Sequence, residues 1–382
     1  MSKPRLCYVV SSEMTARAFL AEHIRAAAGR FEVTVVANAT GAAISGIDAR
    51  LISVPIARNI ALLSDLRALL RLIRVFRRER FDLVHSVTPK AGLLAALAGA
   101  IAGVPVRTHT FTGQVWATRS GPARAFLRML DRVTASLSTA VLADSASQRD
   151  FLVAEGVVAA SRIRVLGQGS VNGVDAARFR PDAAARQRIR VQAGVPPQAV
   201  LFLYLGRISR DKGLLDLAHA FAQLGRDVPD AWLMLVGPDE DHITEEIRLA
   251  CGPSAQRLHI AGYTDRAEQF MASADVFMLP SYREGFGSVV LEAAAAAVPA
   301  IGTRIYGVID AVVEGKTGFL VPVRDPGALV ARMRQLAEDA PLREEMGRAA
   351  RERALRDYRP EDLTRAMLGY YEELLGKGGA RA

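Results

Sequence analysis

The chain has little of what marks a secreted, metal-binding or membrane-spanning protein. Only two of its 382 residues are cysteine, Cys7 and Cys251, so a disulfide framework is not expected and a reducing cytoplasm fits best. Neither His-x-x-x-His nor paired-cysteine spacing occurs, and Asp-x-Asp occurs only at residues 239–241, which argues against a metal site. The longest weakly apolar stretch, residues 91–106, contains Pro105 and is shorter than the roughly 20 residues of a membrane-spanning helix.

Aromatic residues are also scarce, at 6%, whereas positive charge is in surplus by +9. Nucleic acid is one partner that such a surplus suggests, but no zinc spacing or aromatic-basic motif supports it. An anionic membrane surface or a phosphate-bearing substrate is another. Residues 67–80 alternate arginine with leucine, isoleucine, valine and phenylalanine at helical spacing. The segment therefore suits either an amphipathic helix lying on a membrane or an ordinary surface helix of a layered domain.

Short apolar runs alternate with helical patterns along the whole chain, and the rhythm breaks once, between residues 174 and 197. This alternation predicts an α/β protein with two doubly wound, Rossmann-like parallel-sheet domains facing a cleft. We place the domains at residues 1–179 and 180–357, followed by an amphipathic helix within 358–382. The predicted strands are 6–10, 32–36, 83–86, 106–110, 140–143 and 163–166, then 200–205, 232–236, 258–261, 276–279, 299–302 and 318–321.

Two acidic residues, Glu284 and Glu292, flank the point where a buried strand gives way to a helix. Ser288 is the predicted N-cap, which leaves Gly287 free to let a ligand approach the backbone. Glu292 is expected in the first helical turn, where the helix dipole favours a carboxylate. Such a site can hold a phosphate at the helix N-terminus and sugar hydroxyls on the acids. The alternatives are a solvated loop acid for Glu284 and a dipole stabiliser for Glu292.

Two cations follow another predicted strand end. Gly206 turns the chain after residue 205, and Arg207 and Lys212 come next. Two fixed cations at a strand end suit a diphosphate, on which charge develops as a leaving group departs. Solvated basic residues in a loop are the alternative.

Three further segments are candidates on weaker grounds. Asn172 lies in a glycine-rich stretch, residues 167–175, where unusual backbone dihedrals are expected. His109 follows a predicted strand and could donate a hydrogen bond to a substrate hydroxyl, although a structural histidine fits equally well. The same ambiguity applies to His85. We interpret the acidic residues 239–241 as a solvated loop.

The motifs together resemble the retaining, nucleotide-sugar-dependent glycosyltransferases of family 4, which have the GT-B fold. The resemblance is specific between residues 200 and 323, where five motifs occur in order. Those motifs are Gly206-Arg207 with Lys212-Gly213, Val236-Gly237, Pro280-Ser281 with Glu284-Gly285-Phe286-Gly287, Glu292-Ala293, and Thr317-Gly318-Phe319-Leu320-Val321. Looser features at 82–92, His109 and 172–175 are similar to the bacterial surface-polysaccharide and lipid-linked-oligosaccharide branch.

The resemblance implies roles for particular residues. The implied catalytic residues are Glu284, His109, Arg207 and Lys212. Donor binding is implied for Gly206, Arg207, Lys212, Asn172, Tyr263, Glu284, Phe286, Gly287, Ser288 and Glu292, with Glu292 on the ribose. Candidates on the acceptor side are His85, Lys90 and Ser12. Two departures are the absence of a glycine pair after the first strand, where Ser11 and Ser12 stand, and Asp310, where many members carry glutamate.

The resemblance also implies a function. A hexose or N-acetylhexosamine would pass from a nucleoside-diphosphate sugar, with uridine favoured, to a glycan or polyprenyl-linked saccharide, with retention and without a metal or other cofactor. The protein would be cytoplasmic, with peripheral contact at the anionic inner membrane and no nucleic-acid partner, and its C-terminal helix would return to the first domain. A sugar-nucleotide epimerase or hydrolase on the same fold, and a non-catalytic sugar-nucleotide-binding protein, are the alternatives.

Overall fold

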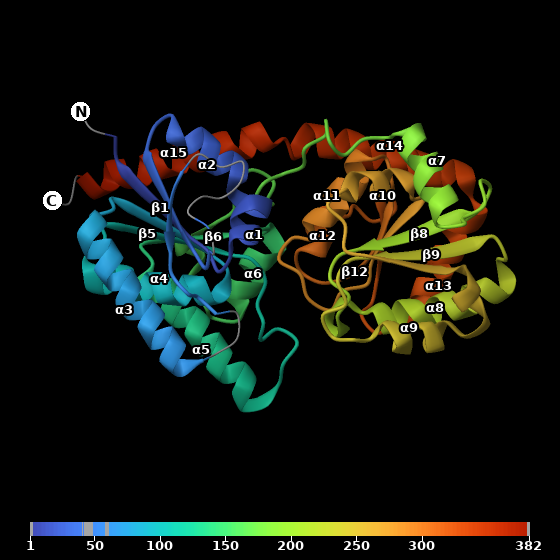
Figure 1. Cartoon of the computed structure of the whole chain (residues 1–382), viewed down its shortest axis with the longest axis horizontal. Coiled ribbons are helices and arrows are strands. Elements are labelled where there is room, and N and C mark those ends of the chain that lie inside the picture. The colour runs from blue at the N-terminus through green and yellow to red at the C-terminus, as the bar shows by residue number, and fades with distance from the viewer. Residues whose placement is uncertain (1–2, 40, 42–48, 58–60, 380–382) are drawn as a thin grey trace. The chain divides into compact units, whose positions relative to one another are not determined.

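The computed structural model describes residues 3–39, 41, 49–57 and 61–379, and the chain forms two compact α/β units (Figure 1). Unit 1 comprises Met1–Asn172 and Pro360–Ala382, and unit 2 comprises Gly173–Arg359. The sequence placed the first boundary at residue 179, but Val174 and Phe179 are buried in the core of unit 2. The polypeptide therefore passes from one unit to the other twice.

Unit 1 contains a parallel sheet of seven strands in the order β3-β2-β1-β4-β5-β6-β7. Its strands are β1 (Arg5–Val9), β2 (Glu32–Ala37), β3 (Arg50–Ser53), β4 (Leu83–Val87), β5 (Val106–Phe111), β6 (Ala140–Ala143) and β7 (Ile163–Arg164). Every strand predicted for this unit is present within a few residues. Strand β3 was not predicted, because it is a short edge strand whose residues stay partly exposed and lack a continuous apolar run.

Helices cover both faces of this sheet. They are α1 (Glu13–Thr15), the π-helical turn η1 (Ala16–Leu20), α2 (Ala21–Ala28), α3 (Leu62–Glu79), α4 (Pro89–Ala102), α5 (Gly121–Leu137), α6 (Ala146–Ala154), the 3₁₀ turn η2 (Ala160–Arg162) and α15 (Pro360–Gly379). Successive residues of β1 point to opposite faces, so Leu6 and Tyr8 pack in one apolar cluster and Cys7 and Val9 in another. Helix α15 packs against α2 in the first of these clusters and contributes Tyr371.

Unit 2 contains a six-stranded parallel sheet in the order β10-β9-β8-β11-β12-β13. Its strands are β8 (Val200–Leu205), β9 (Ala231–Val236), β10 (Leu258–Gly262), β11 (Val276–Leu279), β12 (Ala300–Thr303) and β13 (Gly318–Val321). The helical elements are α7 (Ala183–Gln192), η3 (Arg210–Lys212), α8 (Leu214–Asp227), α9 (Thr244–Cys251), η4 (Gly252–Arg257), α10 (Ala267–Ser273), α11 (Ser288–Ala295), α12 (Val308–Ala311), α13 (Pro326–Glu338) and α14 (Ala340–Asp357). All predicted strands of this unit are present.

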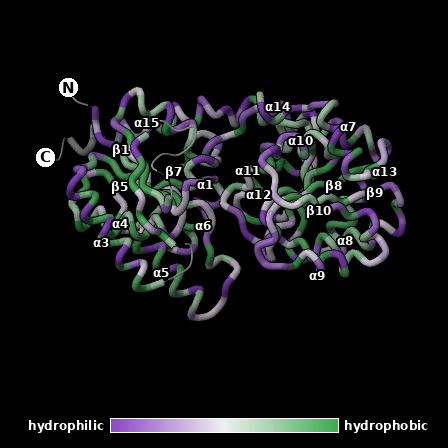
Figure 2. The backbone as a smooth tube through the Cα atoms, viewed as in Figure 1, coloured by the Kyte–Doolittle hydropathy of each residue, from purple (hydrophilic) through white to green (hydrophobic). Residues whose placement is uncertain are grey.

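Apolar residues concentrate in the two sheets, as the hydropathy colouring of Figure 2 shows. Strand β11 is buried along its whole length, which is typical of a parallel strand covered on both faces. Within the described ranges, no helix combines the length and apolar character that a membrane span requires.

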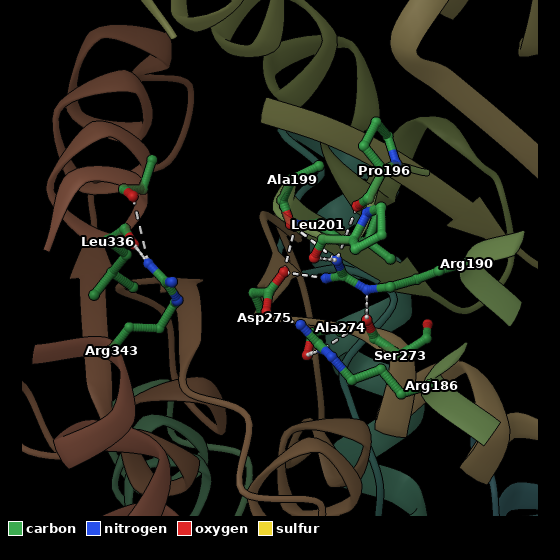
Figure 3. A network of polar contacts seen from close by, with 12 residues as sticks. Arg186, Arg190, Pro196, Ala199, Leu201, Ser273, Ala274, Asp275, Leu336 and Arg343 are labelled. Atoms are coloured by element: carbon green, nitrogen blue, oxygen red, sulfur yellow. Dashed lines mark hydrogen bonds and ion pairs between the residues drawn. The ribbon is translucent and has the colours of Figure 1, made fainter. Parts of the chain in front are cut away.

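A buried polar network fixes the amino ends of β8 and β11 (Figure 3). Asp275 accepts hydrogen bonds from the Leu201 amide at 2.7 Å, from Arg186 at 2.6 Å and from Arg190. Arg190, which is 4% exposed, also donates to the carbonyl oxygens of Ser273 at 3.0 Å and Ala199 at 2.9 Å. The network therefore holds α7 against the amino ends of β8 and β11, the two central strands. The carboxyl ends of these strands lie at the other edge of the sheet.

The strand order of unit 2 reverses between β8 and β11. From β8 the chain continues outward to β9 and β10, and then returns to β11 on the other side of β8. In open parallel sheets, ligands bind beyond the carboxyl ends of the strands at such a reversal. Unit 1 has the corresponding reversal between β1 and β4.

Candidate functional site

The loops that follow β8 and β11 meet at the point where the strand order of unit 2 reverses. Gly213, which follows η3, has a φ of 66°, and a Cβ atom there would lie 2.0 Å from the carbonyl oxygen of Pro280. The amide of Tyr282 also donates to the carbonyl oxygen of Asp211 at 2.9 Å. Only glycine allows this close approach, so the Lys-Gly pair of the sequence fixes the η3 turn against the end of β11.

The structure brings together a predicted cation and a predicted acid at this junction. The Nζ atom of Lys212 donates to Glu284 at 2.6 Å, and their side chains are 13% and 15% exposed. The sequence predicts that both residues bind one ligand, but nothing in it indicates that they pair with each other. The pair places an ammonium group and a carboxylate side by side near the surface of the second unit.

Arg207 lies in the same loop system and is paired with an acid of the segment that the sequence predicts to be a solvated loop. It donates to Glu240 at 2.6 Å. Burial lowers the pKa of Arg207, but the hydrogen bond with Glu240 and the charges of Glu240 and Asp211 outweigh that effect and raise the pKa above its ordinary value. Arg207 is therefore a permanent cation.

The acidic segment 239–241 is exposed at Glu240 and Asp241, as predicted for a solvated loop, but it is also ordered by hydrogen bonds. Asp239 accepts hydrogen bonds from the amides of Ile243 and Thr244, both at 3.0 Å, and Asp241 accepts one from the Arg210 amide at 2.8 Å. These bonds hold the loop after β9 against the start of α9 and against η3. The signal in the sequence was the position of three acids directly after a predicted strand end.

The N-terminus of α11 differs from the prediction by one residue. Gly287 is the N-cap, with φ 76° and ψ 45°, and Ser288 is the first helical residue. Glycine adopts this left-handed conformation without steric cost, so the helix starts there and no side chain caps it. The first backbone N–H groups of a helix have no partner within it, so Ser288 and Val289 present donors at this end. Phe286 contributes only backbone, because its ring is buried against Tyr358.

The prediction that Glu292 lies in the first turn of α11 is wrong. The helix begins at Ser288, so Glu292 lies in the second turn. Its carboxylate is half-buried and makes no hydrogen bond or ion pair within the described part of the chain. Burial raises the pKa of Glu292 to about 7; the positive charge of Arg178 lowers it, and the charge of Glu268 adds to the rise. A half-buried carboxylate that has no protein partner among the described residues and lies near a helix N-terminus is a candidate for binding ligand hydroxyls.

Tyr263 is 70% exposed and follows β10, the edge strand of the sheet. Strand β9 lies between β10 and β8, so Tyr263 is separated by one strand from the loop that follows β8. Gly206 has a φ of 153° and follows β8, as predicted. Asp310 lies in α12, and its carbonyl oxygen accepts a hydrogen bond from Arg353 at 2.6 Å. Among the residues that the structure describes, no three histidine, cysteine, aspartate or glutamate side chains lie close enough to share a metal ion.

The two candidate histidines of unit 1 are core residues. His109 lies within β5 and not after it, is 1% exposed, and shares a hydrogen bond of 2.9 Å with Ser86. His85 is fully buried and hydrogen-bonded to Tyr371 and, at 2.7 Å, to Thr110. Burial lowers the pKa of each imidazole to about 3, so both are neutral at physiological pH. This placement favours the structural role over contact with a substrate, because neither ring reaches the surface.

The other candidates of unit 1 lie at strand and helix ends. Ser12 is the N-cap of α1 and accepts a hydrogen bond from the Thr15 amide at 3.2 Å. Lys90, in the first turn of α4, forms an ion pair of 2.5 Å with Asp65. Asn172 is the last residue of unit 1 before the chain enters unit 2. The predicted unusual dihedrals are confirmed there, because φ is positive at Gly167, Gly169, Ser170 and Gly173.

Sequence reasoning missed two kinds of residue. Asp211 and Arg283, the neighbours of Lys212 and Glu284, form their own ion pair of 2.9 Å. Thr88, which precedes α4 at the strand reversal of unit 1, has a φ of 79°, a strained value for a β-branched residue. The only signal at Thr88 was the proline that follows it.

Comparisons with known proteins identify the family of this chain. Residues 185–353 match the family described as Glycosyl transferases group 1, and residues 15–169 match the Glycosyl transferase 4-like domain. The chain is 31% identical over 324 residues to the capsular polysaccharide biosynthesis glycosyltransferase CapM of Staphylococcus aureus, covering 84% of each protein. The chain therefore belongs to the family 4 type of glycosyltransferases.

A second relative and two solved structures extend the comparison. The chain is 25% identical over 322 residues, 82% of each protein, to the UDP-Gal:alpha-D-GlcNAc-diphosphoundecaprenol alpha-1,3-galactosyltransferase of Escherichia coli. Anabaena HepE, solved in complex with UDP and glucose, superposes with a TM-score of 0.81 at 20% identity, over 97% of this chain and all of that one. Sucrose-phosphate synthase from Thermosynechococcus elongatus gives a TM-score of 0.83 at 21% identity, over 98% and 100%. The fold is thus GT-B, as predicted.

Proposed function

We propose that this glycosyltransferase moves a hexose or N-acetylhexosamine from a UDP-sugar to a glycan or polyprenyl-linked saccharide, with retention of the anomeric configuration. The observation that carries the proposal is the convergence of Lys212, Glu284 and the α11 N-terminus where the strand order reverses. Lys212 and Arg207 bind the diphosphate and stabilise the charge that develops on it as the sugar leaves. Because these cations supply that charge, the reaction needs no metal ion.

Glu292 and Glu284 are proposed to bind different parts of the donor, the ribose and the transferred sugar. Glu292 has no protein partner within the described residues and lies one turn into α11, so it accepts hydrogen bonds from two ribose hydroxyls. Glu284 and the backbone N–H groups of Gly287 and Ser288 orient the sugar and a phosphate. Support for the donor and acceptor classes comes from the relatives, one named for capsular polysaccharide and one for a UDP-galactose donor and a diphosphoundecaprenol acceptor.

The test is transfer from UDP-[14C]galactose, UDP-glucose and their N-acetylated counterparts to a short-chain polyprenyl-diphosphate N-acetylglucosamine. Arg207→Ala, Lys212→Ala and Glu292→Ala are expected to abolish transfer and to leave the melting temperature without ligand nearly unchanged. Arg210→Ala is the matched control, because Arg210 lies on the same η3 turn but pairs with Glu246 at the surface. Full activity of the first three variants would refute the assignment. NMR of the product linkage tests retention, and activity in excess EDTA tests metal independence.

We further propose that α3 contacts an anionic membrane. Its N-terminal half exposes Leu62, Leu63, Leu66 and Leu70, and its exposed cations include Arg67, Arg71 and Arg74. The acids of the helix are already paired, Asp65 with Lys90 and Glu79 with Arg50, so the exposed face is apolar and positive. Helix α4 packs against both α3 and α5, and α5 exposes Phe126 and Met129 in the same layer. This pattern fits a helix that lies in a lipid headgroup region.

Flotation with vesicles that contain phosphatidylglycerol tests the membrane contact. Leu62→Glu, at a side chain that is 81% exposed, is expected to leave the protein unbound. Leu249→Glu is the matched control, because Leu249 on α9 of unit 2 is equally exposed and should not affect flotation. Equal flotation of wild type and both variants, or none at all, would contradict the contact without affecting the donor site.

A further inference from the structure

Two neighbouring residues of η3 and two of the loop after β11 form two adjacent ion pairs. Lys212 pairs with Glu284 at 2.6 Å, and Asp211 pairs with Arg283 at 2.9 Å. Each side contributes one acid and one base, so the four charges alternate. The proposed donor site uses Lys212 and Glu284 and leaves the roles of Asp211 and Arg283 open.

Asp211 places a negative charge where the site needs positive charge. Its side chain is 29% exposed and accepts a hydrogen bond from the Ser209 hydroxyl at 2.6 Å. Burial raises the pKa of Asp211, but that hydrogen bond and the charges of Lys212, Arg283 and Arg207 together lower it below its ordinary value. Asp211 is therefore ionised, and it lies in electrostatic contact with both cations that are proposed to bind the diphosphate.

A diphosphate bound to Lys212 and Arg207 would be repelled by the nearby carboxylate of Asp211 if no cation compensated its negative charge. Arg283 is the only partner of Asp211 on the β11 side for which the structure shows an ion pair within the described residues. The side chain of Arg283 is 21% exposed, and its guanidinium pairs with Asp211 and not with Glu284, the residue next to it in the chain. The carboxylate of Asp211 accepts the hydrogen bond from Ser209 that orders the η3 turn, and the positive charge of Arg283 compensates the negative charge of that carboxylate.

We propose that Arg283 is a positioning residue of the donor site, which neutralises Asp211 so that Lys212 and Arg207 attract the diphosphate, and that it does not itself contact the donor. This inference rests on the proposed function, because it assumes that the donor diphosphate binds at Lys212. It predicts that the charge of Arg283 is dispensable once the charge of Asp211 is removed.

The experiment measures dissociation constants of UDP and of inorganic pyrophosphate by titration calorimetry. Arg283→Met is expected to weaken both ligands about tenfold, because it exposes them to the Asp211 charge. The double variant D211N/R283M is expected to bind within about threefold of wild type, and Asp211→Asn alone at least as tightly as wild type. Arg210→Met is the control, because its ion pair with Glu246 on the same turn is solvent-exposed, and it should change nothing.

The outcomes separate this inference from the proposed function. If Lys212→Met binds UDP as tightly as wild type, the donor site itself is wrong and both proposals fail. If Lys212→Met loses binding but Arg283→Met binds normally, the donor site stands and Arg283 has no role in it. If D211N/R283M is as weak as Arg283→Met alone, Arg283 contacts the donor directly and charge compensation is refuted. Melting curves without ligand, equal for the single and double variants, exclude loss of folding as the cause.

Discussion

Arg190→Met is expected to destabilise unit 2 strongly and to leave unit 1 unaffected. Methionine keeps most of the aliphatic volume but removes the guanidinium that bonds Asp275 and the carbonyl oxygens of Ser273 and Ala199. Breaking a buried ion pair typically costs about 3 to 5 kcal/mol, and each orphaned buried acceptor adds to the cost. Arg186 still pairs with Asp275 and limits the loss, so we expect about 4 kcal/mol.

The two tryptophans of the chain make the measurement specific for each unit. Trp116 is buried in unit 1, and Trp232 lies half-buried on β9 of unit 2. Urea unfolding followed by fluorescence in Trp116→Phe and Trp232→Phe backgrounds therefore reports on one unit at a time. With an m-value of about 2 to 3 kcal/mol/M, the Arg190→Met midpoint seen by Trp232 should fall by about 1 to 2 M.

The control is Arg186→Met, because the side chain of Arg186 is 36% exposed, against 5% for that of Arg190. It should lower the free energy of unfolding of unit 2 by only about 1 kcal/mol. An unchanged midpoint at Trp232 in Arg190→Met, or an equal shift at Trp116, would refute the reasoning. The first result would mean that the network does not hold the sheet, and the second that the two units unfold as one.

Three further predictions concern the site and the core. Gly213→Ala should lower the melting temperature and abolish stabilisation by UDP, because its methyl group would lie 2.0 Å from a backbone oxygen, whereas Gly252→Ala, at a positive φ with open space around it, should cost only about 1 kcal/mol. UDP affinity should fall as pH drops through about 7, because protonation of Glu292 removes its acceptor charge, and Glu292→Gln should show weak, pH-independent binding. Tyr371→Phe should cost unit 1 about 1 kcal/mol in thermal unfolding followed by Trp116 fluorescence, since it leaves His85 with one partner; no loss would show that water replaces the hydroxyl.

The strands were predictable because buried parallel strands consist almost entirely of apolar residues. Strands β8 and β11 have no polar side chain apart from Tyr204, so their positions are evident in the sequence. Strand β3 was missed because an exposed edge strand needs no such run. The start of α11 was displaced by one residue because serine is the commoner cap and the left-handed conformation of Gly287 is a tertiary requirement.

The site residues were predictable where they follow a strand end, which holds for Arg207, Lys212 and Glu284. Their partners were not, because ion pairs such as Arg207–Glu240 and Asp211–Arg283 join segments whose spacing depends on the packed sheet. His109 shows the opposite difficulty. Its position near a strand end suggested access, yet burial depends on Ser86 and on helix α4, neither of which the local sequence reveals.

The assignment of α15 to the first unit has a consequence for synthesis. The hydroxyl of Tyr371 meets His85 on β4, and Thr364 meets His23 on α2, so both buried histidines and the apolar cluster around them lack these partners until this helix is made. The ribosome makes residues 173–359 before it makes that helix. During translation, residues 1–172 therefore remain without their last helix until the whole of unit 2 has been synthesised.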